Sequence, residues 1–363
     1  MHRAGLRTLK TTMAHLQTRS LSSAASSGPR HLMSISDLTP AEFTRLVLNA
    51  SSHKKAVKDA FAAGQTPPKP LHGAMTGKTV AMMFSKRSTR TRVSTEAAVQ
   101  LMGGHPMFLG KDDIQLGVNE SLHDTSVVIS SMTSCMVARV GPHSDVANLA
   151  ASSSVPVINA LSSDFHPLQT IADFQTIHES LSSSTPSPSL NSLGLEGLKI
   201  AWVGDSNNVL FDLAIASVKM GVDIAVASPT GYGIPDHIRK TILAAAEGVA
   251  KPGKLTETTI PEEAIKDADI LVTDTWVSMG QEEEAKKRLA AFKGYQITHE
   301  LAKRGGAKPN WKFMHCLPRH PEEVDDAVFY DKERSLVFPE AENRLWAAVA
   351  ALEAFVVNKG KIL

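Results

Sequence analysis

The chain repeats one pattern along most of its length: a short apolar run, a turn, and then a stretch with helical spacing. Thr79–Phe84 is expected to form a buried strand, followed by a helix through Glu96–Met102 that ends at Gly103-Gly104. The apolar runs at 135–140 and 155–161 each follow a helical stretch in the same way. Strands and helices that alternate at this spacing predict parallel sheets flanked by helices, so the expected fold class is α/β.

The pattern is interrupted once, by the Ser/Pro-rich segment Ser180–Ser192, which has little to bury and predicts a surface excursion at a domain junction. Strands are expected again at Leu198–Val203, Ile224–Ala227, Ile270–Thr273 and Trp311–His315, and a helix with an apolar stripe is expected from Pro339. A chain of 363 residues can bury two cores. The predicted organisation is a leader at 1–33, a first domain at 34–178, a junction at 179–195, a second domain at 196–336 and a C-terminal helix at 337–363.

The N-terminus has the composition of a targeting segment. Five basic residues and no acidic one precede Asp37, and serine and threonine fill much of the rest. This composition is typical of a mitochondrial transit peptide, which would direct the protein to the mitochondrial matrix; a disordered end without a targeting role is the alternative. Folded structure is expected from near Ser36, because Thr39-Pro40-Ala41-Glu42 matches the start of a reciprocally capped helix.

Composition excludes several classes of protein. Without the leader, 33 basic residues face 37 acidic ones, so a strongly basic nucleic-acid binder is excluded. Cys135 and Cys316 are too few for a disulfide scaffold, and no apolar run approaches the ~20 residues of a membrane span. Paired cysteine or histidine ligands at zinc spacing do not occur in the sequence, so neither a metal nor another cofactor is expected.

Two segments imitate nucleotide-binding loops. Gly73–Thr79 looks like a phosphate loop, but it has too few residues between its glycines, and it precedes its strand instead of following it. Ile200–Asp205 looks like the first strand of a dinucleotide fold, but Ser206, Asn207 and Asn208 stand where further glycines are needed. A nucleotide hydrolase and a dehydrogenase are therefore poor interpretations, although both asparagines fall at the ligand-binding end of a strand.

An anion site is predicted where the strand ending at Phe84 gives way to the next helix. Helix N-termini present unpaired N–H groups and a partial positive charge, which favour a bound anion. The hydroxyl groups of Ser88, Thr89 and Thr91 add donors, and Arg90 offers a fork for two phosphate oxygens. Arg92 lies about 200° further round the helix, so we assign Arg90 to the ligand and Arg92 to structure.

Ser88–Arg92 also resembles the carbamoyl-phosphate motif of the aspartate/ornithine carbamoyltransferase family. Further motifs of that family follow in order at Leu116–Ser121, Arg139, His166–Gln169, Asp274–Gly280 and His315–Arg319. The resemblance runs from Leu32 to the C-terminus. It implies a two-domain carbamoyltransferase whose C-terminal helix returns to the first domain, assembled as homotrimers with sites at subunit interfaces.

The same resemblance implies which residues hold carbamoyl phosphate. At the phosphate it places Ser88, Thr89, Arg90, Thr91 and, from the 111–117 loop of a neighbouring subunit, Gln115. At the carbamoyl group it places Arg139, His166, Gln169, Arg344 and the backbone of Cys316 and Leu317, with Thr91 also at the carbonyl oxygen. From the residues alone, an isolated histidine is more often a core or surface residue, and a solvated helix charge is the alternative for Arg344.

The second substrate is indicated by the charges around Asp274. Aspartate brings two carboxylates and would need extra basic residues, but no arginine or lysine occurs from 267 to 285, which favours an acceptor that carries amines. The resemblance implies that L-ornithine is bound by Asn208, Asp274, Ser278 and Met279, with Asp274 and Cys316 near the attacking δ-amine.

The implied reaction moves the carbamoyl group from carbamoyl phosphate to the δ-amine of L-ornithine, giving L-citrulline and phosphate in arginine biosynthesis. The catalytic residues expected are Cys316, Asp274, His166 and Arg139, of which Asp274 and Cys316 would position the amine and help to remove its proton. Cys135, which lies in a strand outside these motifs, is expected to be a core residue. The alternatives are a carbamoyltransferase for putrescine, acetylornithine or aspartate, and a catalytically silent relative.

Overall fold

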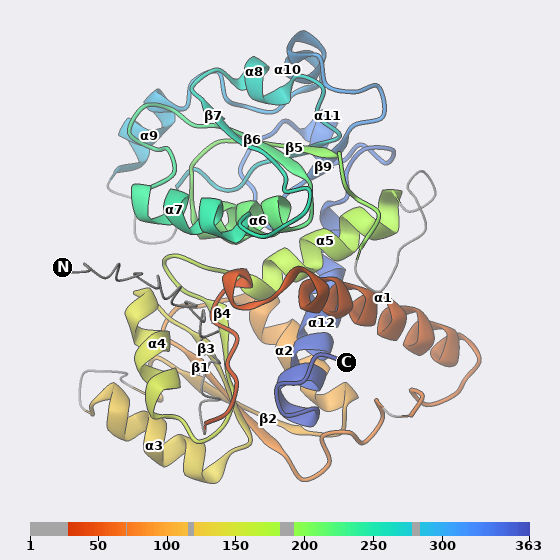
Figure 1. Cartoon of the computed structure of the whole chain (residues 1–363), viewed down its shortest axis with the longest axis vertical. Coiled ribbons are helices and arrows are strands. Elements are labelled where there is room, and N and C mark those ends of the chain that lie inside the picture. The colour runs from red at the N-terminus through yellow and green to blue at the C-terminus, as the bar shows by residue number, and fades with distance from the viewer. Residues whose placement is uncertain (1–27, 70, 115–119, 182–191, 278–283) are drawn as a thin grey trace, which may run out of the picture.

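The chain folds into two α/β domains, one above the other in Figure 1. The structure is a computed structural model and describes residues 28–69, 71–114, 120–181, 192–277 and 284–363. Each domain has one sheet in which all strands are parallel, flanked by helices (Figure 1), as the alternation of strands and helices predicted.

The sheet of the first domain has the strand order β2-β1-β3-β4. Its strands are β1 (Thr79–Phe84), β2 (His105–Gly110), β3 (Cys135–Arg139) and β4 (Val157–Leu161), and its helices include α2 (Thr89–Leu101), α3 (Leu122–Met132) and α4 (His143–Ser152). From β1 the chain continues to β2, which lies on one side of β1, and then to β3, which lies on the other side of β1. The strand order therefore reverses between β1 and β3, the position where open parallel sheets bind ligands.

The sheet of the second domain has the order β7-β6-β5-β8-β9, which reverses between β5 and β8. Its strands are β5 (Lys199–Val203), β6 (Asp223–Ala227), β7 (Leu255–Thr258), β8 (Ile270–Val272) and β9 (Lys312–Met314). Its helices are α6 (Asn208–Lys219), α7 (Asp236–Ala245), α8 (Pro261–Ile265), α9 (Ala285–Ala291), α10 (His299–Gly305) and α11 (Asp326–Phe329).

Two long helices, α5 (Pro167–Leu181) and α12 (Val337–Leu352), contact both domains, and α1 (Pro40–Ala62) packs against both of these helices. Figure 1 shows α5 running between the domains and α12 descending from the second domain into the first. α12 packs against α1, α2 and α5, so the C-terminal helix does return to the first domain. A π-helical turn, η3 (Glu353–Val357), continues it.

Two strands were not predicted, and both lie at the edge of a sheet. β2 alternates exposed and half-buried residues, and β7 is exposed at its two central positions. Neither strand therefore has the continuous apolar run that marks the buried central strands. α12 begins at Val337 rather than at Pro339, because a proline is tolerated in the first helical turn, where its missing N–H has no partner within the helix.

Folded structure begins before Ser36, which corrects the expectation that it starts there. The guanidinium group of Arg30 donates two hydrogen bonds to Glu42, of 2.6 and 3.0 Å, and lies over the ring of Phe355. Leu32 is fully buried, and its N–H donates to the carbonyl of Val157, the first residue of β4. The residues from Arg30 onward are thus part of the first domain.

Other local predictions are confirmed. Thr39 and Glu42 form the reciprocal cap at the start of α1, and Cys135 is a buried core residue. Of the expected junction at 179–195, residues 182–191 lie outside the described residues, while Leu193 and Leu195 are buried in the core. Among the helices that the structure describes, none is both long and apolar enough to cross a membrane.

Candidate active site

The loops that follow the strands of one sheet contact the loops that follow the strands of the other. After β1, Arg90 Nη2 donates to the carbonyl of Leu317, which follows β9, at 2.6 Å. After β5, Asn208 Nδ2 donates to the carbonyl of Ser162, which follows β4, at 2.5 Å. The carboxyl ends of the two sheets therefore face each other, and the predicted site residues on these loops meet between the domains.

α2 begins at the loop after β1, as the predicted anion site requires. The hydroxyl of Ser88 caps the helix by accepting the N–H of Thr91 at 3.2 Å. Arg92 turns away from Arg90: its Nε lies 3.0 Å from Glu96 Oε1, and its guanidinium carbon lies 3.7 Å from the centroid of the Phe108 ring. Arg90 thus reaches across to the second domain while Arg92 holds α2 against β2.

Arg139 and His166 are buried donors with unused hydrogen-bonding capacity. Burial, together with the charges of Arg344 and Arg90, lowers the pKa of Arg139 to about 10. Burial and the same cations, with Arg139, hold the pKa of His166 well below 6.5, so this imidazole is neutral at neutral pH. Arg139 Nε and His166 Nδ1 are buried without a partner in the described part of the chain. Such atoms are the ones that a polar ligand would satisfy.

Arg344 joins α12 to the first domain. It is only 3% exposed, its Nη1 donates to Gln169 Oε1 at 2.5 Å, and its Nη2 donates to Thr91 Oγ1 at 3.3 Å. Burial lowers its pKa to about 10. The alternative that Arg344 is a solvated helix charge is therefore wrong.

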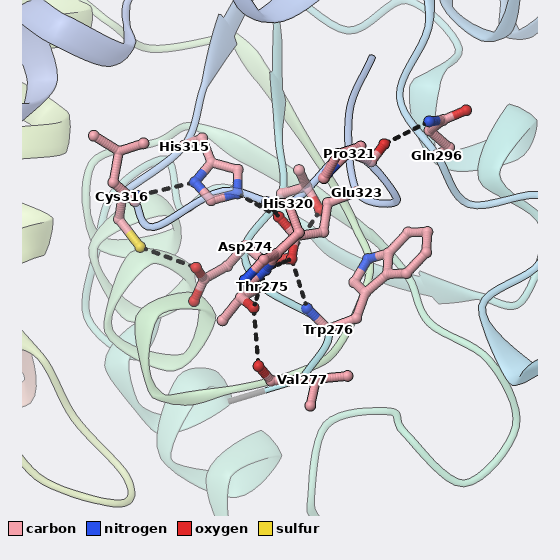
Figure 2. A network of polar contacts seen from close by, with 12 residues as sticks. Asp274, Thr275, Trp276, Val277, Gln296, His315, Cys316, His320, Pro321 and Glu323 are labelled. Atoms are coloured by element: carbon pink, nitrogen blue, oxygen red, sulfur yellow. Dashed lines mark hydrogen bonds and ion pairs between the residues drawn. The ribbon is translucent and has the colours of Figure 1, made fainter. Parts of the chain in front are cut away.

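The second domain presents an acid, a thiol and an amide. Cys316 Sγ donates to Asp274 Oδ1 at 3.1 Å (Figure 2), and Asn207 Nδ2 donates to the other carboxylate oxygen at 2.7 Å. Burial, and then the neighbouring Asp274, raises the pKa of Cys316 well above 9, so its sulfur is a protonated thiol at neutral pH. Cys316 can donate to Asp274, but it cannot act as a base in this state.

A buried glutamate braces the loops that carry Asp274 and Cys316. His315 Nδ1 accepts the N–H of Leu317 at 2.9 Å, which leaves its Nε2 to donate to Glu323 Oε2 at 3.1 Å (Figure 2). Glu323 also accepts the N–H of Trp276 at 3.2 Å. The backbone of Leu317 takes the left-handed φ of 62°, which is rare for a leucine and is held here by its hydrogen bonds on both sides.

One group of described residues has the spacing of a metal site: His320, Glu322 and Glu323. Glu323 already accepts hydrogen bonds from His320 as well as from His315 and Trp276. We therefore assign this group to bracing the loop.

Three contacts of the candidate site were not predicted from the sequence. Sequence reasoning chose Asn208 for the acceptor side, whereas Asn207, which caps α6, is the neighbour of Asp274. It also missed Asp173 and Glu340, two buried acids that contact Gln169. The spacing of Asp173, four residues after Gln169 on a helix, was the available signal. Gln115, Ser278 and Met279 lie outside the described residues.

Comparison with known proteins gives consistent matches over both domains. Residues 30–179 match the carbamoyl-P binding domain of aspartate/ornithine carbamoyltransferase, and residues 196–355 match its Asp/Orn binding domain. A curated protein of Coccidioides immitis, named ornithine carbamoyltransferase, mitochondrial, is 73% identical over 94% of this chain and 96% of its own length. The protein of the same name from Emericella nidulans is 69% identical over 98% and 96%.

Solved structures of such proteins have the same fold. The crystal structure of a mitochondrial ornithine carbamoyltransferase from Coccidioides immitis matches with a TM-score of 0.84 and 71% identity, covering 92% of this chain and 100% of the other. The ornithine carbamoyltransferase from Pyrococcus furiosus matches with a TM-score of 0.79 and 40% identity, covering 91% and 98%.

Proposed function

The chain belongs to the aspartate/ornithine carbamoyltransferase family, and on that premise we propose how its residues carry out the reaction. It transfers the carbamoyl group of carbamoyl phosphate to the δ-amine of L-ornithine, giving L-citrulline and phosphate. One observation carries the assignment of roles: the bond from Arg90 to the Leu317 carbonyl brings the anion loop of the first domain beside the Cys316 loop of the second.

The first domain, with Arg344 of α12, binds the charged donor substrate. Ser88, Thr89 and Thr91 offer hydroxyl groups at the start of α2, and Arg90 is placed to hold phosphate oxygens. Besides burial, the charges of Arg344 and Arg90 lower the pKa of Arg139, and the charge of Arg90 lowers that of Arg344, because these cations lie close together. A dianion between them would replace this repulsion with attraction.

The carbonyl oxygen of the donor gains negative charge as the amine attacks. Arg139 and the neutral His166 would each donate to it, and Arg139 Nε and His166 Nδ1 have no partner among the described residues. Gln169, Arg344 and the Cys316–Leu317 backbone would hold the carbamoyl amide. As the new N–C bond forms, the C–O bond to phosphate breaks, and phosphate leaves with the electron pair into the arginine cluster.

The second domain binds and orients the acceptor. Asp274 would accept a hydrogen bond from the amines of ornithine, with Asn207 and the Cys316 thiol fixing the carboxylate. A free alkyl ammonium has a reference pKa near 10.4, so it must lose a proton before it attacks. Because Cys316 is a thiol, Asp274 is the basic member of this pair. Asn208, Ser278 and Met279 are proposed to complete the acceptor site.

We propose a mitochondrial matrix location and a homotrimer in which a neighbour's Gln115 reaches the phosphate. The mitochondrial location follows from the relatives, and the transit peptide is proposed to end before Arg30, which is part of the fold. Large apolar side chains are exposed on α2, β2 and α3 of the first domain, which supports a subunit interface there: Val93, Met107, Val127, Val128 and Met132.

The test is an acceptor comparison with the chain lacking residues 1–27. Carbamoyl phosphate is supplied with L-ornithine, putrescine, acetylornithine or aspartate, and product is measured at matched concentrations. We expect citrulline from L-ornithine to form at least about 100-fold faster than any other product. No product from L-ornithine would overturn the proposal.

A further inference from the structure

Two buried acids lie behind the donor site, and none of the roles proposed so far uses them. Asp173 on α5 is 3% exposed and Glu340 on α12 is 2% exposed. Their carboxyl groups contact the same amide nitrogen, Gln169 Nε2, which brings them together between the two helices. Buried acids are rare unless they are paired, so these two are expected to have a specific role.

Both acids hold the same side chain. Gln169 Nε2 donates to Asp173 Oδ1 at 2.7 Å and to Glu340 Oε1 at 3.0 Å, while Gln169 Oε1 accepts Arg344 Nη1 at 2.5 Å. The reverse amide orientation would place the NH₂ group against a guanidinium and the oxygen against two acids. The pair therefore fixes which end of the amide lies beside Arg344.

Glu340 also contacts the second domain. Its Oε2 accepts the N–H of His315 at 2.9 Å, one residue before Cys316. The orientation of Gln169 is thus tied to the loop whose backbone is proposed to hold the other side of the carbamoyl group.

The two acids are best described as one unit that shares a proton. Burial raises the pKa of both carboxyl groups, and the charge of Asp173 raises the pKa of Glu340 further, because two like charges would otherwise meet in a dry site. With one proton between them, the unit still offers an acceptor to Gln169 and another to His315.

We propose that Asp173 and Glu340 are positioning residues that hold the Gln169 oxygen toward the donor substrate, so that the site selects a carbamoyl group over an acyl group of the same shape. A carbamoyl NH₂ can donate to the second lone pair of that oxygen, which already accepts Arg344, whereas a methyl group in its place leaves that lone pair without a donor. This inference rests on the proposed function.

The test compares two probes that differ only at this position. Phosphonoacetamide carries the NH₂ group, and acetonylphosphonate carries a methyl group in its place. Dissociation constants are measured by calorimetry, and the selectivity is their ratio on one and the same protein, so a partly inactive preparation does not affect it. For the unmodified chain we expect at least about tenfold preference for phosphonoacetamide.

Glu340→Gln should remove most of that preference. The introduced amide can accept only one of the two N–H groups that Glu340 accepts, so Gln169 or His315 loses its acceptor. Asp173→Asn should keep the preference within about twofold, because its oxygen still accepts Gln169 and its NH₂ replaces the shared proton. This rescue by the conservative variant separates positioning from mere packing.

Glu179→Gln is the matched control. Glu179 accepts Gln175 Nε2 at 2.9 Å, the same four-residue contact on the same helix, but away from the donor site. The preference should not change. A preference that is absent in the unmodified chain, or unchanged in Glu340→Gln, overturns the inference while citrulline formation stands; a chain that makes no citrulline and binds neither probe overturns the proposed function instead.

Discussion

The two walls of the candidate site, one from each domain, use opposite electrostatics. The first-domain wall, with Arg344 of α12, gathers the buried Arg139 and Arg344, whose pKa values are lowered, beside the half-buried Arg90, and Arg139 Nε and His166 Nδ1 have no partner among the described residues. On the second-domain wall, both carboxylate oxygens of Asp274 accept hydrogen bonds, one from Asn207 and one from Cys316. The first wall is poised for a ligand that brings negative charge, and the second is built to orient a group that brings positive charge.

This comparison explains why the two substrates would bind at different walls. Repulsion among the arginines destabilises the site, and a bound anion relieves this repulsion. Affinity for the donor should therefore depend on the first wall. The acceptor wall contacts the attacking amine rather than the phosphate, so its residues should affect turnover more than donor affinity. The following variants test that division, from the largest expected effect to the smallest.

Asp274→Asn should reduce kcat by about 100-fold or more, because the carboxylate that orients and accepts from the δ-amine is lost. Its affinity for phosphonoacetamide, measured by calorimetry, should stay within about twofold of the unmodified chain. A loss of phosphonoacetamide affinity as large as the loss of kcat would erase the distinction between the walls.

Arg90→Lys should raise the KM for carbamoyl phosphate by about 30-fold, because lysine keeps the charge but loses the fork that can bind two phosphate oxygens. The matched control is Arg92→Lys on the same turn, whose partners are Glu96 and Phe108. We expect the KM of that control to stay within about threefold. Equal effects of the two substitutions in steady-state assays would contradict the assignment of Arg90.

Cys316→Ser should lower kcat by about tenfold and leave phosphonoacetamide affinity unchanged, because the hydroxyl still donates to Asp274 but with different length and acidity. Cys135→Ala, in the buried β3, should lower the thermal midpoint without lowering kcat. A selective loss of donor affinity in Cys316→Ser would contradict the assignment of Cys316 to the acceptor wall.

The pH dependence should follow the acceptor. kcat/KM for ornithine should rise from about pH 6 to 9, because a growing fraction of the amine is neutral. His166 is already neutral across this range, since its pKa is held well below 6.5, and Cys316 stays protonated, since its pKa is raised well above 9. A flat profile, with chemistry shown to be rate-limiting, would contradict the requirement for a neutral amine.

Sequence reasoning succeeded where the physics is local. The buried strands Thr79–Phe84 and Cys135–Arg139 have continuous apolar runs, and the separation of Arg90 from Arg92 follows from helical geometry. It failed where a residue's role depends on another segment. The edge strand at 255–258 is recognisable only beside β6, and the packing of Arg30 depends on Glu42 and Phe355.

The same limit applies within the site. Glu340 is 171 residues from Gln169 in the chain, and its spacing to that residue carries no signal. Asn207 and Asn208 are adjacent, and only the start of α6 decides which of them faces Asp274. Resemblance could propose the groups that touch a substrate, but the contact of Glu340 with Gln169 required coordinates.

The most direct test of the two-wall account is a crystal structure of the chain lacking residues 1–27 with phosphonoacetamide and L-norvaline, which lacks the δ-amine. The account predicts the phosphonate at the start of α2 with Arg90, the amide NH₂ at Gln169 Oε1, and the norvaline side chain pointing from the Asp274 wall toward the carbonyl carbon. A phosphonate bound away from Arg90, or both ligands held on one wall, would contradict it.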